Sequence, residues 1–133
     1  MLFRSKQFQP LLDFFKEKLP ELKDVRLSRR LRDSAAVLVA EQGAIGPHME
    51  RLLQRFGRAD EIPPSKKILE INPDHPAVAA VEKLFTKDSR DPRLEKYAVI
   101  LYEQAVVAEG SRVRDPIAFA RRINELLVKD ASG

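Results

Sequence analysis

Residues 91–109 read DPRLEKYAVILYEQAVVAE, and this stretch decides the fold. It opens with Asp91-Pro92, a typical helix start. The Asp side chain can accept hydrogen bonds from free backbone N–H groups, and a Pro in the first turn has no N–H to leave unpaired. Within Tyr97–Ala108 only Glu103 and Gln104 interrupt the apolar residues. A surface helix needs one apolar stripe, so a helix that is apolar on nearly every side needs cover from several neighbours.

The next segment, residues 115–129, repeats this pattern. It opens with Asp115-Pro116, and its apolar residues again form more than one stripe: Ile117, Phe119, Ala120, Ile123, Leu126 and Leu127. Two consecutive helices of this kind carry more apolar surface than one small domain can cover. A second copy of the chain is the simplest cover, because two helical hairpins packed about a two-fold axis make a four-helix bundle.

The first ninety residues predict a compact body. Apolar residues at three- and four-residue spacing indicate a helix over Ser5–Leu19, with its regular part beginning near Gln9 because Pro10 suits only a first turn. A further helix is expected over Pro76–Phe85. Three short apolar or alternating runs predict strands: Asp24–Ser28, Ala35–Ala40 and Lys67–Ile71.

Strands grouped among helices, without one-for-one alternation, indicate an α+β fold. We expect a small three-stranded, mostly antiparallel sheet with helices on one face. The chain is then one domain over residues 1–133, with an α+β body at 1–90 and a dimerisation hairpin and tail at 91–133.

The segment between Gly43 and Gly57 predicts a separate amphipathic helix, bounded by glycines at both ends. Its apolar residues follow helical spacing: Ile45, Met49, Leu52, Leu53 and Phe56. Such a stripe is more often part of a core, which is the first interpretation. If it is exposed, it marks an interaction site, which is the second.

Composition excludes several classes of protein. The chain has 133 residues, of which 44% are hydrophobic and 33% charged, and it contains no Cys. Disulfides and thiolate chemistry are therefore excluded, and no apolar run approaches the roughly 20 residues of a membrane span. The first residues do not resemble a signal peptide. We expect a cytoplasmic protein that does not bind membranes.

The excess of basic residues is mild, with 24 Lys and Arg against 20 Asp and Glu. The basic residues cluster at four places: Arg29/Arg30/Arg32, Lys66-Lys67, Arg112/Arg114 and Arg121-Arg122. No aromatic residues interleave with them as base stacking would require, so solvated faces and ion pairs are the favoured interpretation. A basic dimeric nucleic-acid-binding module stays open as the alternative function.

Catalytic motifs are missing from the sequence. The five glycines are scattered rather than gathered in a phosphate-binding loop, and His48 and His75 each stand without a second ligand at helical spacing. For His75, hydrogen bonding within a turn is the simpler role. We therefore predict no enzyme activity, no metal site and no cofactor in this chain.

Three motifs carry a resemblance to a known family. They are LEINPDHP at 69–76, LYEQA at 101–105 and RRINELL at 121–127. In this order, and over about Ser5–Val128, the sequence resembles the C-terminal dimerisation domain of the ninety-kilodalton heat-shock chaperones, most closely the bacterial members. The resemblance implies an ATP-dependent homodimeric chaperone. It also implies that ATP and Mg²⁺ bind in an N-terminal domain absent from these residues.

The resemblance also implies sites. The terminal hairpin is expected to form the intersubunit bundle, with these residues at the dimer interface: Leu94, Tyr97, Leu101, Ala105, Ala108, Phe119, Ile123, Leu126 and Leu127. The alternative is that some of them pack only within their own subunit. The helix with Ile45, Met49, Leu52, Leu53 and Phe56 is expected to contact client protein. The implied partners are a second copy of the chain and unfolded clients, with no nucleic acid.

Overall fold

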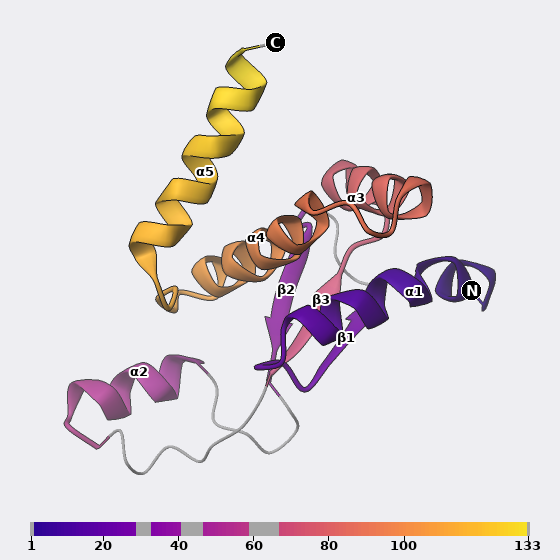
Figure 1. The fold of residues 1–133 in the computed structure, drawn as a ribbon. Coiled ribbons are helices and arrows are strands. Elements are labelled where there is room, and N and C mark those ends of the chain that lie inside the picture. The colour runs from indigo at the N-terminus through magenta and orange to yellow at the C-terminus, as the bar shows by residue number, and fades with distance from the viewer. Residues whose placement is uncertain (1, 29–32, 41–46, 59–66, 133) are drawn as a thin grey trace.

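The computed structural model describes residues 2–28, 33–40, 47–58 and 67–132 (Figure 1). Its elements in chain order are α1 (Leu2–Lys18), β1 (Asp24–Leu27), β2 (Ala36–Val39), α2 (Pro47–Arg55), β3 (Ile68–Ile71), α3 (Pro76–Lys87), α4 (Arg93–Ala108) and α5 (Pro116–Ala131). These five helices and three strands confirm the predicted α+β class. Residues 29–32, 41–46 and 59–66 lie outside the described residues, and so does the first part of the segment predicted between Gly43 and Gly57.

The sheet has the order β1-β3-β2, with β3 in the centre. β3 pairs antiparallel with β2 and parallel with β1. The sheet is therefore mixed, and the expectation of a mostly antiparallel sheet was wrong. Successive strands do alternate in direction. The parallel pair arises because β3 inserts between β1 and β2 and so lies beside β1, which runs in the same direction as β3.

One face of the sheet forms the core of the domain. Leu69 and Ile71 of β3 are fully buried there, at 0% exposure, and Val25 of β1 and Ala36 of β2 lie beside them in register. α1 and α4 cover this face, as the sequence predicts for helices on one side (Figure 1). The opposite face carries polar groups, including an ion pair of 2.7 Å between Arg26 and Glu70.

Helix α1 begins earlier than the sequence predicts. It starts at Leu2 and runs through Pro10, whereas the regular helix was expected from about Gln9. Pro10 removes one backbone hydrogen bond and crowds the preceding turn. The helix continues because its apolar side is buried against the sheet, with Phe8 4% and Phe15 0% exposed, and tertiary packing supplies most of the stability of a helix in a protein.

The predicted helix starts are present. Asp115 Oδ1 accepts a hydrogen bond of 3.0 Å from the Ala118 N–H at the start of α5. His75 Nδ1 accepts the N–H of Ala77 at 3.0 Å, so this histidine caps α3, as its position in a turn suggested. These side chains satisfy N–H groups that a helix leaves free at its N-terminus.

Asp91 is the corresponding residue before α4. Its Oδ1 accepts the backbone N–H of Arg93 at 2.9 Å, and its Oδ2 accepts a hydrogen bond of 2.7 Å from Arg93 Nη2. The side-chain hydrogen bonds from Arg93, followed by the backbone one, lower the pKa of Asp91 from 3.8 to about 2. The charged carboxylate is therefore favoured by the folded state.

This pKa shift predicts an acid-sensitive start of α4. The folded pKa lies below the unfolded one, so the stabilisation is complete above pH 3.8 and is lost as the pH falls through about 2. Asp91→Asn should lower the urea midpoint at pH 7 and make the midpoint change less between pH 4 and pH 2. NMR titration of the wild-type carboxyl should give a midpoint near 2. A midpoint at or above 3.8 would contradict this assignment.

Candidate interaction surfaces

Helix α4 places its predicted interface residues in two different environments. Leu94, Leu101 and Ala105 are 0%, 4% and 1% exposed, and they are buried within their own subunit. The structure therefore packs these three side chains within their own chain, which is the alternative that the sequence left open. Tyr97 is half-buried and Ala108 is exposed. The body of the domain thus covers most of the apolar side chains of α4.

Helix α5 is different, because none of its residues is buried. Its most exposed apolar side chains are Ile117 at 74%, Val128 at 66%, Leu127 at 59% and Ile123 at 40% exposure. Ile117 and Val128 are eleven residues apart and Ile123 and Leu127 are four apart, so at about 100° per residue all four lie on one broad side of the helix. Phe119 and Leu126, both predicted for the interface, are half-buried, and Ala120 is exposed.

Sequence reasoning omitted Ile117 and Val128 from the interface. Both are among the most exposed large apolar residues of the chain, and with Ala120 and Asn124 they line a shallow hollow on α5. The signal was in the sequence, since Ile117, Asn124 and Val128 follow one another at seven and four residues and so share a side of the helix.

An ion pair holds α5 on α4. Arg122 Nε donates to Glu103 Oε1 at 2.8 Å, and Arg122 Nη2 donates to Glu103 Oε2. The distance of the second contact is 2.6 Å, and Glu103 is only 6% exposed. Such a bidentate pair fixes direction as well as distance. Lys96 and Glu125 form a second, more exposed pair at 2.8 Å. Sequence reasoning treated Glu103 only as an interruption of an apolar run.

Helix α2 turns its apolar side away from the body. Met49 is 49% exposed and Phe56, just beyond the helix, is 71% exposed, while Leu52 and Leu53 are half-buried. Ile45, the fifth predicted client-contacting residue, lies outside the described residues. An amphipathic helix of a soluble protein normally buries this side and exposes the polar one. In α2 no described side chain is buried, and two large apolar ones, Met49 and, just after the helix, Phe56, are exposed.

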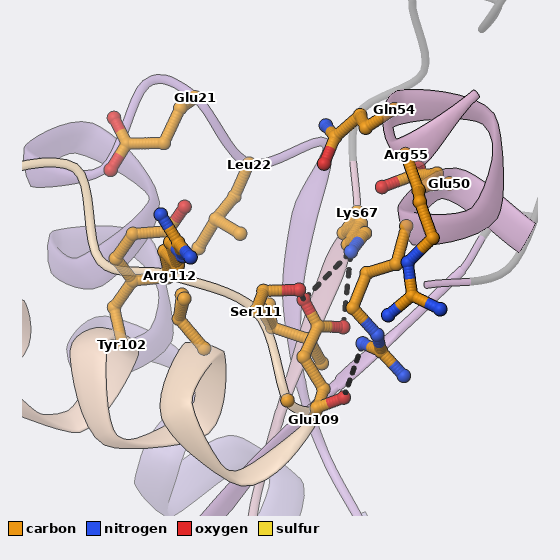
Figure 2. Close-up of a pocket in the computed structure, with 14 residues that line it drawn as sticks. Glu21, Leu22, Glu50, Gln54, Arg55, Lys67, Tyr102, Glu109, Ser111 and Arg112 are labelled. Carbon is orange, nitrogen blue, oxygen red and sulfur yellow. Dashed lines mark hydrogen bonds and ion pairs between the residues drawn. The ribbon is translucent and has the colours of Figure 1, made fainter. Parts of the chain in front are cut away.

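The polar side of α2 faces a cavity of about 880 Å³ between this helix and the body (Figure 2). Four residues of α2 line the cavity: Glu50, Arg51, Gln54 and Arg55. Across from them lie Lys67, before β3, and Tyr102 and Glu109, on and just after α4. Burial raises the pKa of the Tyr102 hydroxyl, which therefore stays neutral.

Glu109 is the centre of a small polar network at this cavity. Its carboxylate accepts hydrogen bonds from Lys67 Nζ, at 2.7 Å, and from Ser111 Oγ, at 2.8 Å. Its backbone oxygen accepts a hydrogen bond of 3.2 Å from Arg51 Nη1. Glu109 therefore joins α2, the start of β3 and the connection between α4 and α5 (Figure 2).

The basic clusters are only partly free to bind an acidic partner. Lys67 and Arg122 are paired with Glu109 and Glu103. Arg112, Arg114 and Arg121 are exposed, and the cluster at 29–32 lies outside the described residues. The two most buried of these cations therefore act within the fold.

Over 2–28, 33–40, 47–58 and 67–132, no group of three or more His, Cys, Asp or Glu side chains is placed to hold a metal ion. Within the same ranges, no helix has both the length and the apolar character needed to cross a membrane.

Comparison with known proteins defines the class of this fold. Residues 3–132 match the family model described as Hsp90 protein, and the chain belongs to this family of chaperones. Among curated proteins it is similar to the "Chaperone protein HtpG" of Geobacter sulfurreducens, with 48% identity over 95% of the chain. The proteins of the same name from Geobacter metallireducens and Bordetella pertussis are 47% and 40% identical over 94% of it. The chain spans only 19% of the length of each.

The ion pair between α4 and α5 gives a prediction. Arg122→Gln would leave the buried Glu103 carboxylate without its partner, which should lower the free energy of unfolding by about 1.5–3 kcal/mol and speed amide exchange in α5. The measurements are urea unfolding and hydrogen exchange. The matched control is Arg121→Gln, at the exposed neighbouring position, which should change stability by less than about 0.5 kcal/mol. Equal losses in the two variants would contradict a structural role for this pair.

Proposed function

We propose that this chain is the C-terminal homodimerisation domain of an ATP-dependent chaperone and that it also contacts unfolded client protein. In this proposal the hairpin of α4 and α5 pairs with the same hairpin of a second copy. The apolar side of α2 contacts clients. The Hsp90 family assignment supports the chaperone class, and the two exposed apolar surfaces support the two finer roles.

The observation that carries the dimer proposal is the state of α5. This helix of 16 residues has no buried residue, although it presents four large apolar side chains. An isolated helix of this length is marginally stable in water, and a contiguous exposed apolar surface usually marks an interaction site. A second hairpin would cover this side, and an interface of standard size buries about 1,200–2,000 Å² in total.

The exposure values change the expected centre of the interface. We place it on the open side of α5, at Ile117, Ile123, Leu127 and Val128, and on the exposed end of α4 at Val107 and Ala108. Leu94, Leu101 and Ala105 act indirectly in this proposal, because they fix α4 on the body and so orient the hairpin.

The client surface is supported by the orientation of α2. Met49 and Phe56 point to solvent, and the thioether and the ring are adaptable contacts for partners of varied sequence. A helix that served only the core of its own domain would bury these side chains. The second interpretation of this stripe, an exposed interaction site, is therefore the one we adopt.

Other parts of the proposal concern the whole chaperone. Because the chain spans 19% of its relatives, we assign ATP and Mg²⁺ binding to a part of the protein outside these 133 residues. We also place the chaperone in the cytoplasm. ATP binding by the isolated chain, measured by calorimetry, would contradict the first assignment.

The dimer proposal is tested by charges on the open side of α5. Ile123→Glu combined with Leu127→Glu should give a monomer, because each carboxylate would have to be buried without a partner in the bundle. Light scattering on a sizing column measures the mass. The control is Lys129→Glu, an exposed position on another side of the same helix, which should stay dimeric. Circular dichroism checks that the helix content of the variant is unchanged. If the double variant is still dimeric, this side of α5 is not part of the interface.

The client proposal is tested on α2. Met49→Ser combined with Phe56→Ser should weaken binding of a permanently unfolded probe, reduced and carboxymethylated lactalbumin, by about thirtyfold or more, since each large apolar side chain contributes about 1–2 kcal/mol when partly buried and about 1.4 kcal/mol is a factor of ten. Fluorescence anisotropy of the labelled probe measures the affinity. The control is Gln54→Ala on the polar side of the helix. Unchanged affinity in the double variant would mean that clients bind elsewhere.

A further inference from the structure

Helix α2 has an unusual attachment to the body. It lies beside a cavity rather than against the core, and four of its polar residues line that cavity (Figure 2). Among the described residues, one hydrogen bond is recorded from α2 to the rest of the domain: Arg51 Nη1 donates to the backbone oxygen of Glu109. Within the described part of the chain, Arg51 is thus the residue of α2 whose side chain reaches the body with a hydrogen bond.

The acceptor of this hydrogen bond is suited to a guanidinium group. Glu109 follows the last residue of α4, and the carbonyl oxygens at a helix C-terminus lack partners within the helix. The helix dipole also places partial negative charge there, which favours a cation such as Arg51. The side-chain ion pair of Glu109 with Lys67, at 2.7 Å, holds this acceptor in place.

Gly110 makes room for the guanidinium. A Cβ at this position would lie 3.0 Å from Arg51 Nη1 and 3.4 Å from Arg51 Cζ, so any side chain would press on the group. Gly110 also has a φ of +90°, which residues with a side chain rarely adopt. Its N–H and that of Ser111 close the end of α4 by bonding to Val107 and Val106. Gly110 therefore ends α4 and also leaves the space that the Arg51 guanidinium occupies.

We propose that Arg51 is the positioning residue of α2: it latches this helix to the C-terminal turn of α4 and so holds the apolar side of α2 toward solvent. Because the same turn leads into the connection to α5, the latch ties the client surface to the hairpin. The part that concerns clients rests on the proposed function. The latch itself rests on Arg51, Glu109 and Gly110.

Amide hydrogen exchange of the 133-residue chain tests the latch without a client. In Arg51→Gln, the amides of residues 47–55 should exchange about two- to fivefold faster, the effect of losing one exposed hydrogen bond to a charged group. Exchange in the sheet and in α4 should not change. The control is Arg55→Gln, which removes the same charge from the same helix and the same cavity lining.

Two further variants separate a latch from a general effect of charge. Arg51→Lys keeps a cation at the end of α4 and should restore part of the protection. Gly110→Ala alters no residue of α2 and yet should also speed exchange in 47–55, because its methyl group would displace the guanidinium. The thermal midpoint of each variant shows whether the domain is folded; Arg51→Gln keeps the test valid if Gly110→Ala does not fold.

The outcomes are distinct. Faster exchange of α2 in Arg51→Gln but not in Arg55→Gln would support the latch. Equal effects in both variants, no effect in either, or unprotected α2 amides in the wild type would overturn it. If exchange changes as expected but the unfolded probe binds Met49→Ser/Phe56→Ser as tightly as the wild type, the latch stands and the client proposal fails.

Discussion

Helix α4 packs into the body with one side and carries α5 on another, and the rest of the structure depends on this double role. Ala98, Leu101 and Ala105 belong to the core cluster that α4 forms with the sheet and α1. The buried Glu103 then directs α5 through its bidentate pair with Arg122. A buried carboxylate is costly without a partner, so this pair favours the direction that α5 takes from α4.

That geometry leaves two apolar surfaces exposed, and each fits a different partner. The side of α5 carries four large exposed apolar side chains, and ion pairs join this helix to α4, which suits pairing with an identical helix. The side of α2 is short and belongs to a helix with little contact to the core, which suits adaptation to varied sequences. Both surfaces lie on segments joined by the turn at Glu109 and Gly110.

The sequence predicted the elements well because their signals are local. Asp115 and His75 mark helix starts, and the alternating or apolar runs mark strands. The pairing of the strands was less predictable, since the insertion of β3 between β1 and β2 depends on contacts between distant segments. The predicted start of the regular helix near Gln9 was wrong because it considered only the local cost of Pro10. The burial of Phe15 and its neighbours stabilises α1 enough for the helix to continue through this proline.

The sites were predicted as segments rather than as residues. The run around Leu101 is apolar on nearly every side, so its sequence does not show which side of the helix faces the core. The exposed side of α5 could be identified only from the structure, in which α5 packs on α4. For α2 the stripe was evident, but whether it faces the body depends on Arg51 and Glu109, which are 58 residues apart.

In the proposed dimer, the hairpin of α4 and α5 needs a second copy of itself to cover the apolar side of α5. The most direct test is the mass of the wild-type chain in solution, measured by light scattering on a sizing column over a series of concentrations. We expect twice the mass of one chain at micromolar concentration and above. A single-chain mass that persists at the highest concentration would contradict the proposed dimer, because α5 would then be stable with its apolar side exposed.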